Sequence, residues 1–339
     1  MKTTAAYLRA PWKTELRTVD IPDAPRPGWV RLRVDACGLC GTDVTAAVQN
    51  KDWGPFGHEI AGTVVAVAPD VPENLKPGAT VVVESCSACG RCSECRNGRP
   101  DLCRAPVDNI WGEPAMGFSA EMYAPAVACV PYAGLSPAVA SLTEPAGVAF
   151  DLVKTAEIQL GQRVCVVGPG PIALAAIALV KARGAARIVC IGTRRSAARL
   201  ALARELGAET VFADDTAARD ALKGQFDHVL MTAPTAEIAP ALAYLAYGGI
   251  ETYIGIGAGD STISFNANDF HFRKLQLRAS FASPALYFPA VLALLRAGVI
   301  PGDRLISHRF PLEQIGDALA AARDDKAHAL KIVVTRSPD

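Results

Sequence analysis

The chain has 339 residues, half of them apolar, and its 34 Lys and Arg residues balance 34 Asp and Glu residues. This length supports more than one hydrophobic core, and the lack of net charge argues against a protein that binds nucleic acid or an anionic membrane. The longest apolar run, Pro171 to Val180, is too short to cross a bilayer, and the charged N-terminal segment does not resemble a signal peptide. We therefore expect a cytoplasmic protein whose ten cysteines are reduced thiols or metal ligands.

The first part of the chain contains short β-branched runs that are broken by Gly and Pro. Three of them are Val30–Val34, Gly62–Val67 and Ala79–Val83. Alternating or continuous β-branched residues between turn residues are typical of strands. We expect these runs to form a barrel-like β domain over residues 1–146.

Four cysteines stand close together within this domain, separated by two, two and seven residues: Cys89, Cys92, Cys95 and Cys103. Four thiolates at this spacing can enclose one Zn²⁺ in a tetrahedron, and a closed shell of four cysteines is typical of a structural site, because catalysis needs an open position. The pattern predicts a structural zinc in a lobe at about residues 84–105. Cys86 is a fifth cysteine nearby that could compete as a ligand.

From Gln162 onward, apolar strands alternate with Ala- and Leu-rich helices. The expected strands are Arg163–Val167, Arg187–Ile191, Thr210–Phe212, His228–Met231, Ile250–Gly255 and Leu275–Phe281, and the expected helices include Ile172–Arg183 and Ala197–Leu206. This βαβ rhythm predicts an α/β domain with a doubly wound parallel sheet over residues 147–283. The tail, residues 284–339, has helices near Pro289–Ala297 and Ile315–Ala322 and a strand Lys331–Thr335, and we expect it to return to the first domain.

A glycine-rich turn joins the first of these strands to its helix. It contains Gly168, Gly170, Pro171, Ile172 and Ala173. Gly168 permits a tight turn, Gly170 lets a pyrophosphate approach the backbone, and Ala173 keeps the helix close to the strand. The free N–H groups at the start of the helix favour phosphate. The turn therefore predicts a Rossmann dinucleotide site.

The end of the second strand indicates which dinucleotide is bound. An NAD site usually has Asp or Glu here, which binds the ribose 2′-hydroxyl. This chain instead has Thr193, Arg194, Arg195 and Ser196. Two guanidinium groups suit a 2′-phosphate, because arginine forms bidentate, charge-assisted hydrogen bonds with phosphate. We expect NADP as the preferred cofactor and NAD as a possible one; the alternative is that both arginines are solvated residues at a helix start.

Several motifs follow one another in an order that resembles a known enzyme family. Cys40-Gly-Thr-Asp43, Gly57-His58-Glu59, the four-cysteine lobe, Glu144-Pro145 and the glycine turn occur in this order in zinc-dependent medium-chain alcohol and polyol dehydrogenases. The resemblance covers essentially the whole chain and implies a GroES-like catalytic domain beside a Rossmann domain. Glu144 stands where alcohol dehydrogenases proper have a second cysteine, which resembles the sorbitol, glucose and threonine dehydrogenase branch.

The resemblance also implies a second, catalytic zinc in each subunit. Cys40 and His58 would hold it, and either Glu59 or Glu144 would complete the shell, with the other carboxylate behind it. Asp43 is the expected partner that orients His58. Zinc would act as a Lewis acid on the bound alcohol, whose carbon delivers hydride to the nicotinamide.

Two hydroxyl groups bear on the path of the alcohol proton. Thr42 lies where the family has a hydroxyl that takes this proton. Thr45 lies where many relatives have a histidine that passes it on, so the relay in this chain must use water or another group.

The leading hypothesis is therefore an NADP-linked zinc dehydrogenase that acts on a secondary alcohol of a sugar, polyol or related substrate. An L-threonine or amino-alcohol dehydrogenase would share the same metal motifs. A zinc-free quinone or enoyl reductase would lack Cys40, His58 and the four cysteines. A zinc ribbon that binds nucleic acid would need a basic face and no dinucleotide turn. The family resemblance further implies a homodimer or homotetramer.

Overall fold

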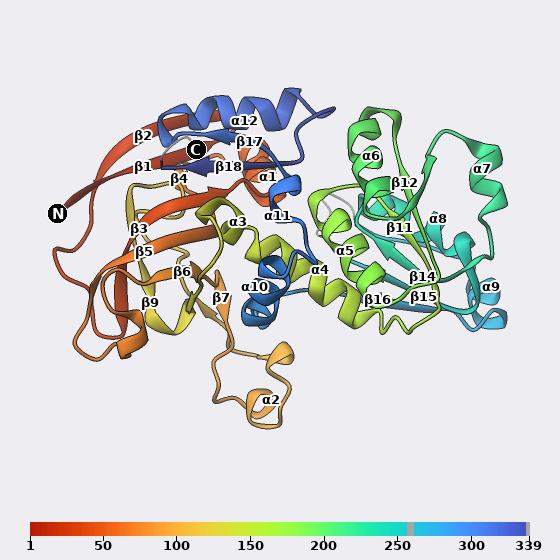
Figure 1. Cartoon of the computed structure of the whole chain (residues 1–339), viewed down its shortest axis with the longest axis horizontal. Helices are drawn as coiled ribbons and strands as arrows, with labels where there is room; N and C mark the ends of the chain where they lie inside the picture. The colour runs from red at the N-terminus through yellow and green to blue at the C-terminus, as the bar shows by residue number, and fades with distance from the viewer. Residues whose placement is uncertain (256–260, 337–339) are drawn as a thin grey trace.

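The computed structural model describes residues 1–255 and 261–336 and has two lobes (Figure 1). The first lobe is built on a seven-stranded sheet in which β3 pairs with β5, β9 and β18. The order along the sheet is β10 (Cys129–Pro131), β6 (Thr80–Val83), β5 (Glu59–Val67), β3 (Trp29–Gly38), β18 (Lys331–Thr335) and β17 (Ile306–Phe310), with β9 (Glu121–Pro125) against β3. The C-terminal strands β17 and β18 thus lie in the same sheet as the N-terminal strand β3.

A smaller sheet and two helices complete this lobe. The sheet has the order β2 (Lys13–Asp20), β1 (Lys2–Arg9) and β4 (Gly54–Pro55), and the helices are α1 (Gly41–Gln49) and α12 (Ile315–Asp324). Buried side chains of both sheets and of α12, among them Leu8, Leu32, Ile60 and Leu319, form one continuous core. This core fixes the end of β3, which Cys40 follows, and the start of β5, which His58 precedes.

The four-cysteine segment forms a small projection below the first lobe (Figure 1). Its base is the two-stranded sheet of β7 (Cys86–Ser87) and β8 (Val107–Asp108), and it contains the short helix α2 (Ser93–Arg96). None of the residues in α2 is buried. A segment with so little core of its own depends on a metal or another cross-link for its shape.

The second lobe is a six-stranded sheet in which every strand pairs in parallel with its neighbours. Its order is β13 (Glu209–Phe212), β12 (Arg187–Gly192), β11 (Arg163–Val167), β14 (Phe226–Met231), β15 (Leu245–Tyr253) and β16 (Gln276–Ala279). Numbered along the chain, this is the 3-2-1-4-5-6 order of dinucleotide-binding sheets, which reverses between the first and fourth strands. The expected fold class is confirmed.

Helices cover both faces of this sheet because alternate residues of each strand point to opposite sides. Val164 and Val166 belong to one core, with α5 (Pro171–Ala182) and α6 (Ala197–Glu205), whereas Cys165 and Val167 belong to the other. The second core lies under α7 (Thr216–Ala221), α8 (Ile238–Ala241) and α9 (Ala267–Phe272). No helix among the described residues is long and apolar enough to span a membrane.

Two helices lie between the lobes (Figure 1): α4 (Thr143–Thr155) and α10 (Phe288–Arg296). Buried residues of α4, such as Ala149 and Leu152, share one core with the parallel sheet and with Ala36 of β3. The short helices α3 (Pro137–Ser141) and α11 (Gly302–Leu305) adjoin this region. The start of α4 is therefore fixed relative to both lobes.

One buried group of the parallel sheet has no evident partner. Glu251 on β15 is 0% exposed, and neither carboxylate oxygen has a hydrogen-bond partner among the described residues. Its strand neighbours are Val229 and Leu277. Burial raises the pKa of Glu251 from its ordinary value of 4.5 to about 8, because a charged carboxylate is poorly solvated in an apolar site.

This shift predicts how stability depends on pH. As pH rises above about 4.5, the unfolded chain releases the proton of Glu251, whereas the folded protein keeps it up to about pH 8. The stability that the protonated Glu251 provides is therefore complete below about pH 4.5 and is lost as pH approaches about 8. Between pH 6 and pH 8, Glu251 should lower the free energy of unfolding of the native protein by about 2 kcal/mol. This decrease should be absent in Glu251→Gln. Urea unfolding at both pH values measures it.

A matched control is Glu237→Gln, which changes an exposed glutamate of the same domain. The difference in unfolding free energy between native protein and this control should be independent of pH. Parallel pH profiles for native protein and Glu251→Gln would show that Glu251 is ionised in the fold.

Candidate metal centres and dinucleotide site

The projection brings the four expected cysteines together. The sulfur atoms of Cys89, Cys92, Cys95 and Cys103 all lie within 4.8 Å of one another, and no other such group occurs within residues 1–255 and 261–336. Cys89 Sγ is 4.0 Å from Cys95 Sγ, and Cys92 Sγ is 3.9 Å from Cys103 Sγ. Sulfurs on a tetrahedral zinc with 2.3 Å bonds are about 3.8 Å apart. The four thiols therefore fit one zinc, and the buried Cys86 is not among them.

Backbone groups in this lobe favour the thiolate form that binds metal. The N–H groups of Arg91 and Cys92 donate toward Cys89 and lower the pKa of its thiol to about 6. Hydrogen bonds to a charged group stabilise that form. The N–H of Cys89 donates in turn to Cys103 Sγ over 3.3 Å. The backbone thus favours the thiolate form of Cys89, whereas desolvation and the neighbouring thiols raise the pKa of Cys95 to about 12.

A second set of ligand types meets between the lobes. Cys40 is the N-cap residue of α1, His58 directly precedes β5, and Glu144 lies in the first turn of α4. His58 Nε2 is 4.0 Å from Glu144 Oε1, and the Cys40 side chain is a hydrogen-bond partner of His58. One thiol, one imidazole and one carboxylate are ligand types that zinc accepts in catalytic sites. Unlike the four sulfur atoms, the ligand atoms of these three residues do not all lie within 4.8 Å of one another.

The charges around His58 favour a cation. Burial alone would lower the pKa of His58, but the hydrogen bond and charge of Cys40, together with Glu144 and Asp43, raise it to about 10. Burial raises the pKa of Glu144 to about 7 and also raises that of Asp43. Several acidic groups therefore converge on one buried imidazole, which is the electrostatic setting of a metal site.

Asp43 differs from its expected role as the direct partner of His58. Its Oδ2 accepts the backbone N–H of Cys40 over 2.9 Å, as the third residue of α1 does in a capping box. His58 Nδ1 is buried and has no hydrogen-bond partner among the described residues. Asp43 is therefore seen to order the Cys40 end of the site and to act on His58 through its charge.

Glu59 is held by a residue that sequence reasoning did not identify. Lys331 Nζ lies 2.6 and 2.7 Å from the two oxygens of Glu59 and 3.1 Å from the carbonyl of Leu39. Both side chains are at most 5% exposed. Burial would lower the pKa of Lys331, but Glu59 and other acidic groups raise it, so the amine stays charged. A lysine at the start of β18 gives no sequence signal for a contact so distant along the chain.

The two threonines near Cys40 are both exposed. Thr42 Oγ1 lies 3.5 Å from Cys40 Sγ, so its hydroxyl is next to the candidate metal ligands. Thr45 Oγ1 donates to the carbonyl of Gly41 over 3.0 Å, within the helix. Its hydrogen is therefore engaged with the backbone.

The glycine turn lies at the reversal point of the parallel sheet. Gly168 has φ +94°, and a Cβ there would lie 3.0 Å from Ala233 N, so only glycine fits without strain. Gly170 is the N-cap residue of α5, and a Cβ there would meet no atom within 4 Å. Open space at this point, in front of the free N–H groups of a 12-residue helix, fits a pyrophosphate.

The two expected arginines differ in their surroundings. Arg194 Nε forms an ion pair of 2.6 Å with Asp214 Oδ2, and its guanidinium lies 4.6 Å from the Phe212 ring centroid. Arg195 is exposed and has no ion-pair or hydrogen-bond partner among the described residues. Asp214 was missed in the sequence because it follows the third strand, where no motif is expected. A 2′-phosphate would have to compete with Asp214 for Arg194.

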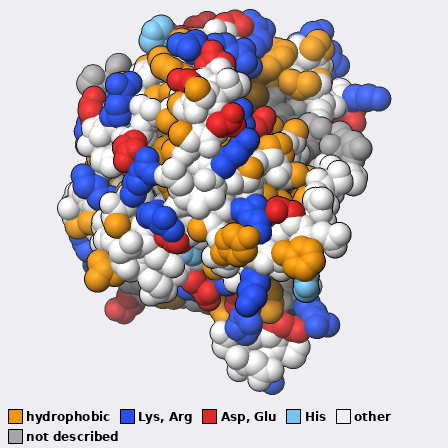
Figure 2. All heavy atoms as spheres, turned by 90° about the vertical axis from the view of Figure 1, so that its right-hand side faces the viewer, with side chains coloured by type: hydrophobic (Ala, Val, Ile, Leu, Met, Phe, Trp, Pro, Cys, Tyr) orange, Lys and Arg blue, Asp and Glu red, His pale blue; other side chains and the backbone are white. Residues whose placement is uncertain are grey.

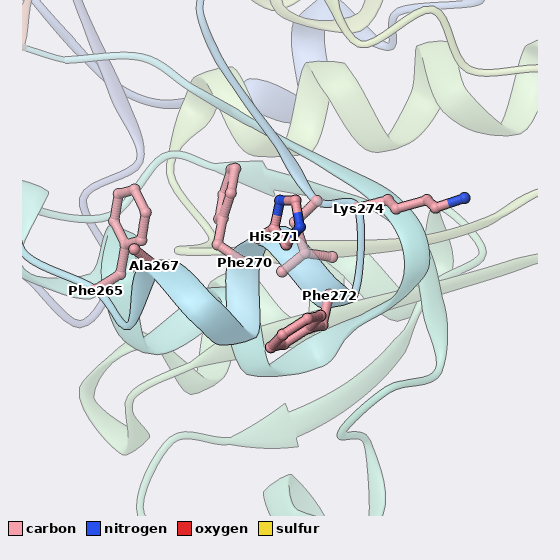
Figure 3. Close-up of a pocket in the computed structure, with 7 residues that line it drawn as sticks. Phe265, Ala267, Phe270, His271, Phe272 and Lys274 are labelled. Atoms are coloured by element: carbon pink, nitrogen blue, oxygen red, sulfur yellow. The ribbon is translucent and has the colours of Figure 1, made fainter.

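A separate cavity of about 540 Å³ lies beside α9, and none of the candidate metal-binding or dinucleotide-binding residues lines it. Figure 3 shows its lining, which includes Phe265, Phe270 and Phe272. Figure 2 shows that basic and acidic side chains are mixed over this end of the molecule.

Comparisons with known proteins identify the family of the chain. Residues 26–134 match the family described as alcohol dehydrogenase GroES-like domain, and residues 171–297 match the family described as zinc-binding dehydrogenase. The chain is 33% identical to D-altritol 5-dehydrogenase of Agrobacterium fabrum over 89% of each chain. It is 31% identical to L-arabinitol 4-dehydrogenase of Aureobasidium melanogenum, over 94% of this chain and 90% of that protein.

One solved structure is similar to the chain over nearly its full length. A zinc-binding dehydrogenase from Sinorhizobium meliloti bound to NADP is 27% identical, with a TM-score of 0.86, and the match covers 99% of each chain. The similarity therefore extends over both lobes.

We expect Cys95→Ser to remove one zinc per chain and to lower the melting temperature by at least about 5 °C, because the lobe has little apolar core to replace the metal. Metal analysis and thermal unfolding measure these effects. Cys86→Ser is the matched control and should keep the metal content of the native protein. Unchanged zinc in Cys95→Ser would count against a metal held by this cluster.

Proposed function

Because the chain belongs to the zinc-dependent medium-chain alcohol and polyol dehydrogenase family, we propose that it transfers hydride between a secondary alcohol of a sugar or polyol and NADP. The observation that carries this proposal is the meeting of Cys40, His58 and Glu144 between the two lobes. The substrates in the names of the altritol and arabinitol dehydrogenases support the substrate class.

We assign the catalytic metal to Cys40, His58 and Glu144, with Glu59 outside the shell. Glu144 Oε1 faces the imidazole at 4.0 Å, whereas both oxygens of Glu59 accept from Lys331. A carboxylate that is fully paired with a buried amine would have to give up that pair to bind a metal, which is costly. This leaves Glu144 as the carboxylate that is available to zinc.

When bound, zinc supplies Lewis acidity to the alcohol oxygen and the nicotinamide accepts hydride. The chain itself must orient the alcohol and remove its proton. Thr42 Oγ1 lies 3.5 Å from Cys40 Sγ and is exposed, so it can take this proton while it passes its own hydrogen to water. Thr45 donates to Gly41 and does not need to take part in the relay.

NADP is preferred in this proposal because Arg195 is free to pair with a 2′-phosphate and no acid ends β12. The NADP complex of the Sinorhizobium meliloti protein supports the same cofactor. The cytoplasm keeps cysteine thiols reduced, and four cysteines that gather as metal ligands support it as the location.

The experiment that tests the function is turnover of L-arabinitol, D-altritol, sorbitol and L-threonine by zinc-loaded protein with NADP. We expect kcat/KM for at least one polyol to exceed that for L-threonine about tenfold or more. Cys40→Ala should be inactive with all four, because a metal ligand is lost. Faster oxidation of L-threonine would instead favour the amino-alcohol dehydrogenase reading, and no reduction of NADP by any of the four would contradict the proposal.

We expect Arg195→Ala to raise the Kd of NADPH by about tenfold or more and to leave that of NADH nearly unchanged, since a charge-assisted hydrogen bond to phosphate is lost. Asp214→Asn should tighten NADPH several-fold, because it releases Arg194 from its ion pair. Fluorescence titration measures both constants.

Arg183→Ala, which removes an exposed arginine at the end of α5, is the control for general charge effects. It should leave the Kd of NADPH unchanged. Equal weakening of NADPH and NADH by Arg195→Ala would overturn the phosphate assignment.

A further inference from the structure

An exposed tryptophan stands directly beside the candidate metal site. The ring centroids of Trp111 and His58 are 5.6 Å apart and the rings are inclined by 40°. His58 is 5% exposed, whereas Trp111 is 46% exposed. The indole therefore borders the buried imidazole on one side and solvent on the other.

The chain before Trp111 is firmly anchored. Asn109 is 1% exposed, and its Nδ2 donates to the carbonyl of Glu84 over 2.9 Å and to Ser87 Oγ over 2.7 Å. Ile110 is completely buried. Because Asn109 directly follows β8, the strand that leaves the four-cysteine lobe, this lobe also fixes where the Trp111 loop begins.

The chain after Trp111 is anchored as well. Gly112 has φ +88°, which turns the backbone sharply after the tryptophan. Glu113 forms an ion pair with Arg26, and the carbonyl of Pro114 accepts from Tyr7 over 2.8 Å. Trp111 is thus carried on a short loop whose two ends are held, so its indole is positioned before any ligand arrives.

We propose that Trp111 is a specificity-determining residue whose indole forms one wall of the substrate site and packs against the carbon chain of an extended polyol. The inference rests on the proposed function and adds the feature that recognises the substrate. A sugar alcohol has hydroxyls that need polar partners, and also a C–H surface that is covered well by a flat aromatic ring. Ligand sites commonly combine such an apolar wall with a few polar groups.

Trp111 contacts carbons next to the reacting one, because the reacting oxygen would bind at the metal held by Cys40, His58 and Glu144 while the indole flanks His58. A five- or six-carbon polyol is long enough to reach the indole, and a short secondary alcohol such as 2-butanol makes little contact with it. Trp111 therefore contributes to the binding of long polyols and much less to that of short alcohols.

The kinetic test compares L-arabinitol with 2-butanol in the native enzyme, Trp111→Ala, Trp111→Phe and Trp53→Phe. Trp53 is the matched control, since it is partly buried and lies under the guanidinium groups of Arg9 and Arg17. We expect Trp111→Ala to lower kcat/KM for L-arabinitol about tenfold or more, mainly through KM, and to change that for 2-butanol by less than about threefold. Trp111→Phe should restore most of the loss, and Trp53→Phe should behave as native.

A binding measurement tests the same inference without turnover. NADPH and L-arabinitol are both reduced, so they form a complex in which no hydride can be transferred. The apparent Kd of L-arabinitol, from the rise in melting temperature of the NADPH complex, should increase about tenfold in Trp111→Ala and stay native in Trp53→Phe.

Failure of the proposed function and failure of the role of Trp111 would give different results. Native protein that binds L-arabinitol through Trp111 but oxidises no polyol contradicts the proposed function alone. Equal losses for both alcohols, or an unchanged Kd for L-arabinitol in Trp111→Ala, overturn the role of Trp111. Zinc content equal to native in every tryptophan variant separates these effects from damage to the metal site.

Discussion

The buried ion pair between Glu59 and Lys331 is the constraint on which the candidate catalytic site depends. The two residues are 272 positions apart in the chain, yet Lys331 reaches both oxygens of Glu59 and the carbonyl of Leu39. Removing one partner of such a pair leaves an uncompensated buried charge, which typically costs about 3–5 kcal/mol. The pair joins β18 to the strand that follows His58, and it occupies the carboxylate next to that histidine.

A second constraint joins the metal site to the dinucleotide site. Glu144 stands in the first turn of α4, and the remainder of that helix packs in the core that also contains α5 and the inner strands of the parallel sheet. Because interiors are close-packed, Glu144 cannot shift without moving this core. The position of Glu144 relative to the glycine turn at Gly168 is therefore fixed.

Much of this arrangement is predictable from sequence because its signals are local. The glycine turn, the four cysteines and the strand runs such as Arg163–Val167 are each contained within about twenty residues, and the parallel sheet follows from their order. Lys331 is not predictable in this way, since it pairs with a residue 272 positions away, and Asp214 is not, since no motif marks the end of the third strand. The early start of β15 at Leu245 was also missed, because Gly248 and Gly249 within it resemble a turn.

We propose that Glu144, and not Glu59, binds the catalytic metal, and the zinc content per chain of two variants distinguishes these carboxylates. The two variants are Glu144→Gln and the double variant Glu59→Gln with Lys331→Met, which removes both charges of the buried pair and so avoids an unpaired amine. We expect the double variant to keep two zincs per chain and Glu144→Gln to keep one. Loss of a zinc from the double variant, with both retained in Glu144→Gln, would contradict it.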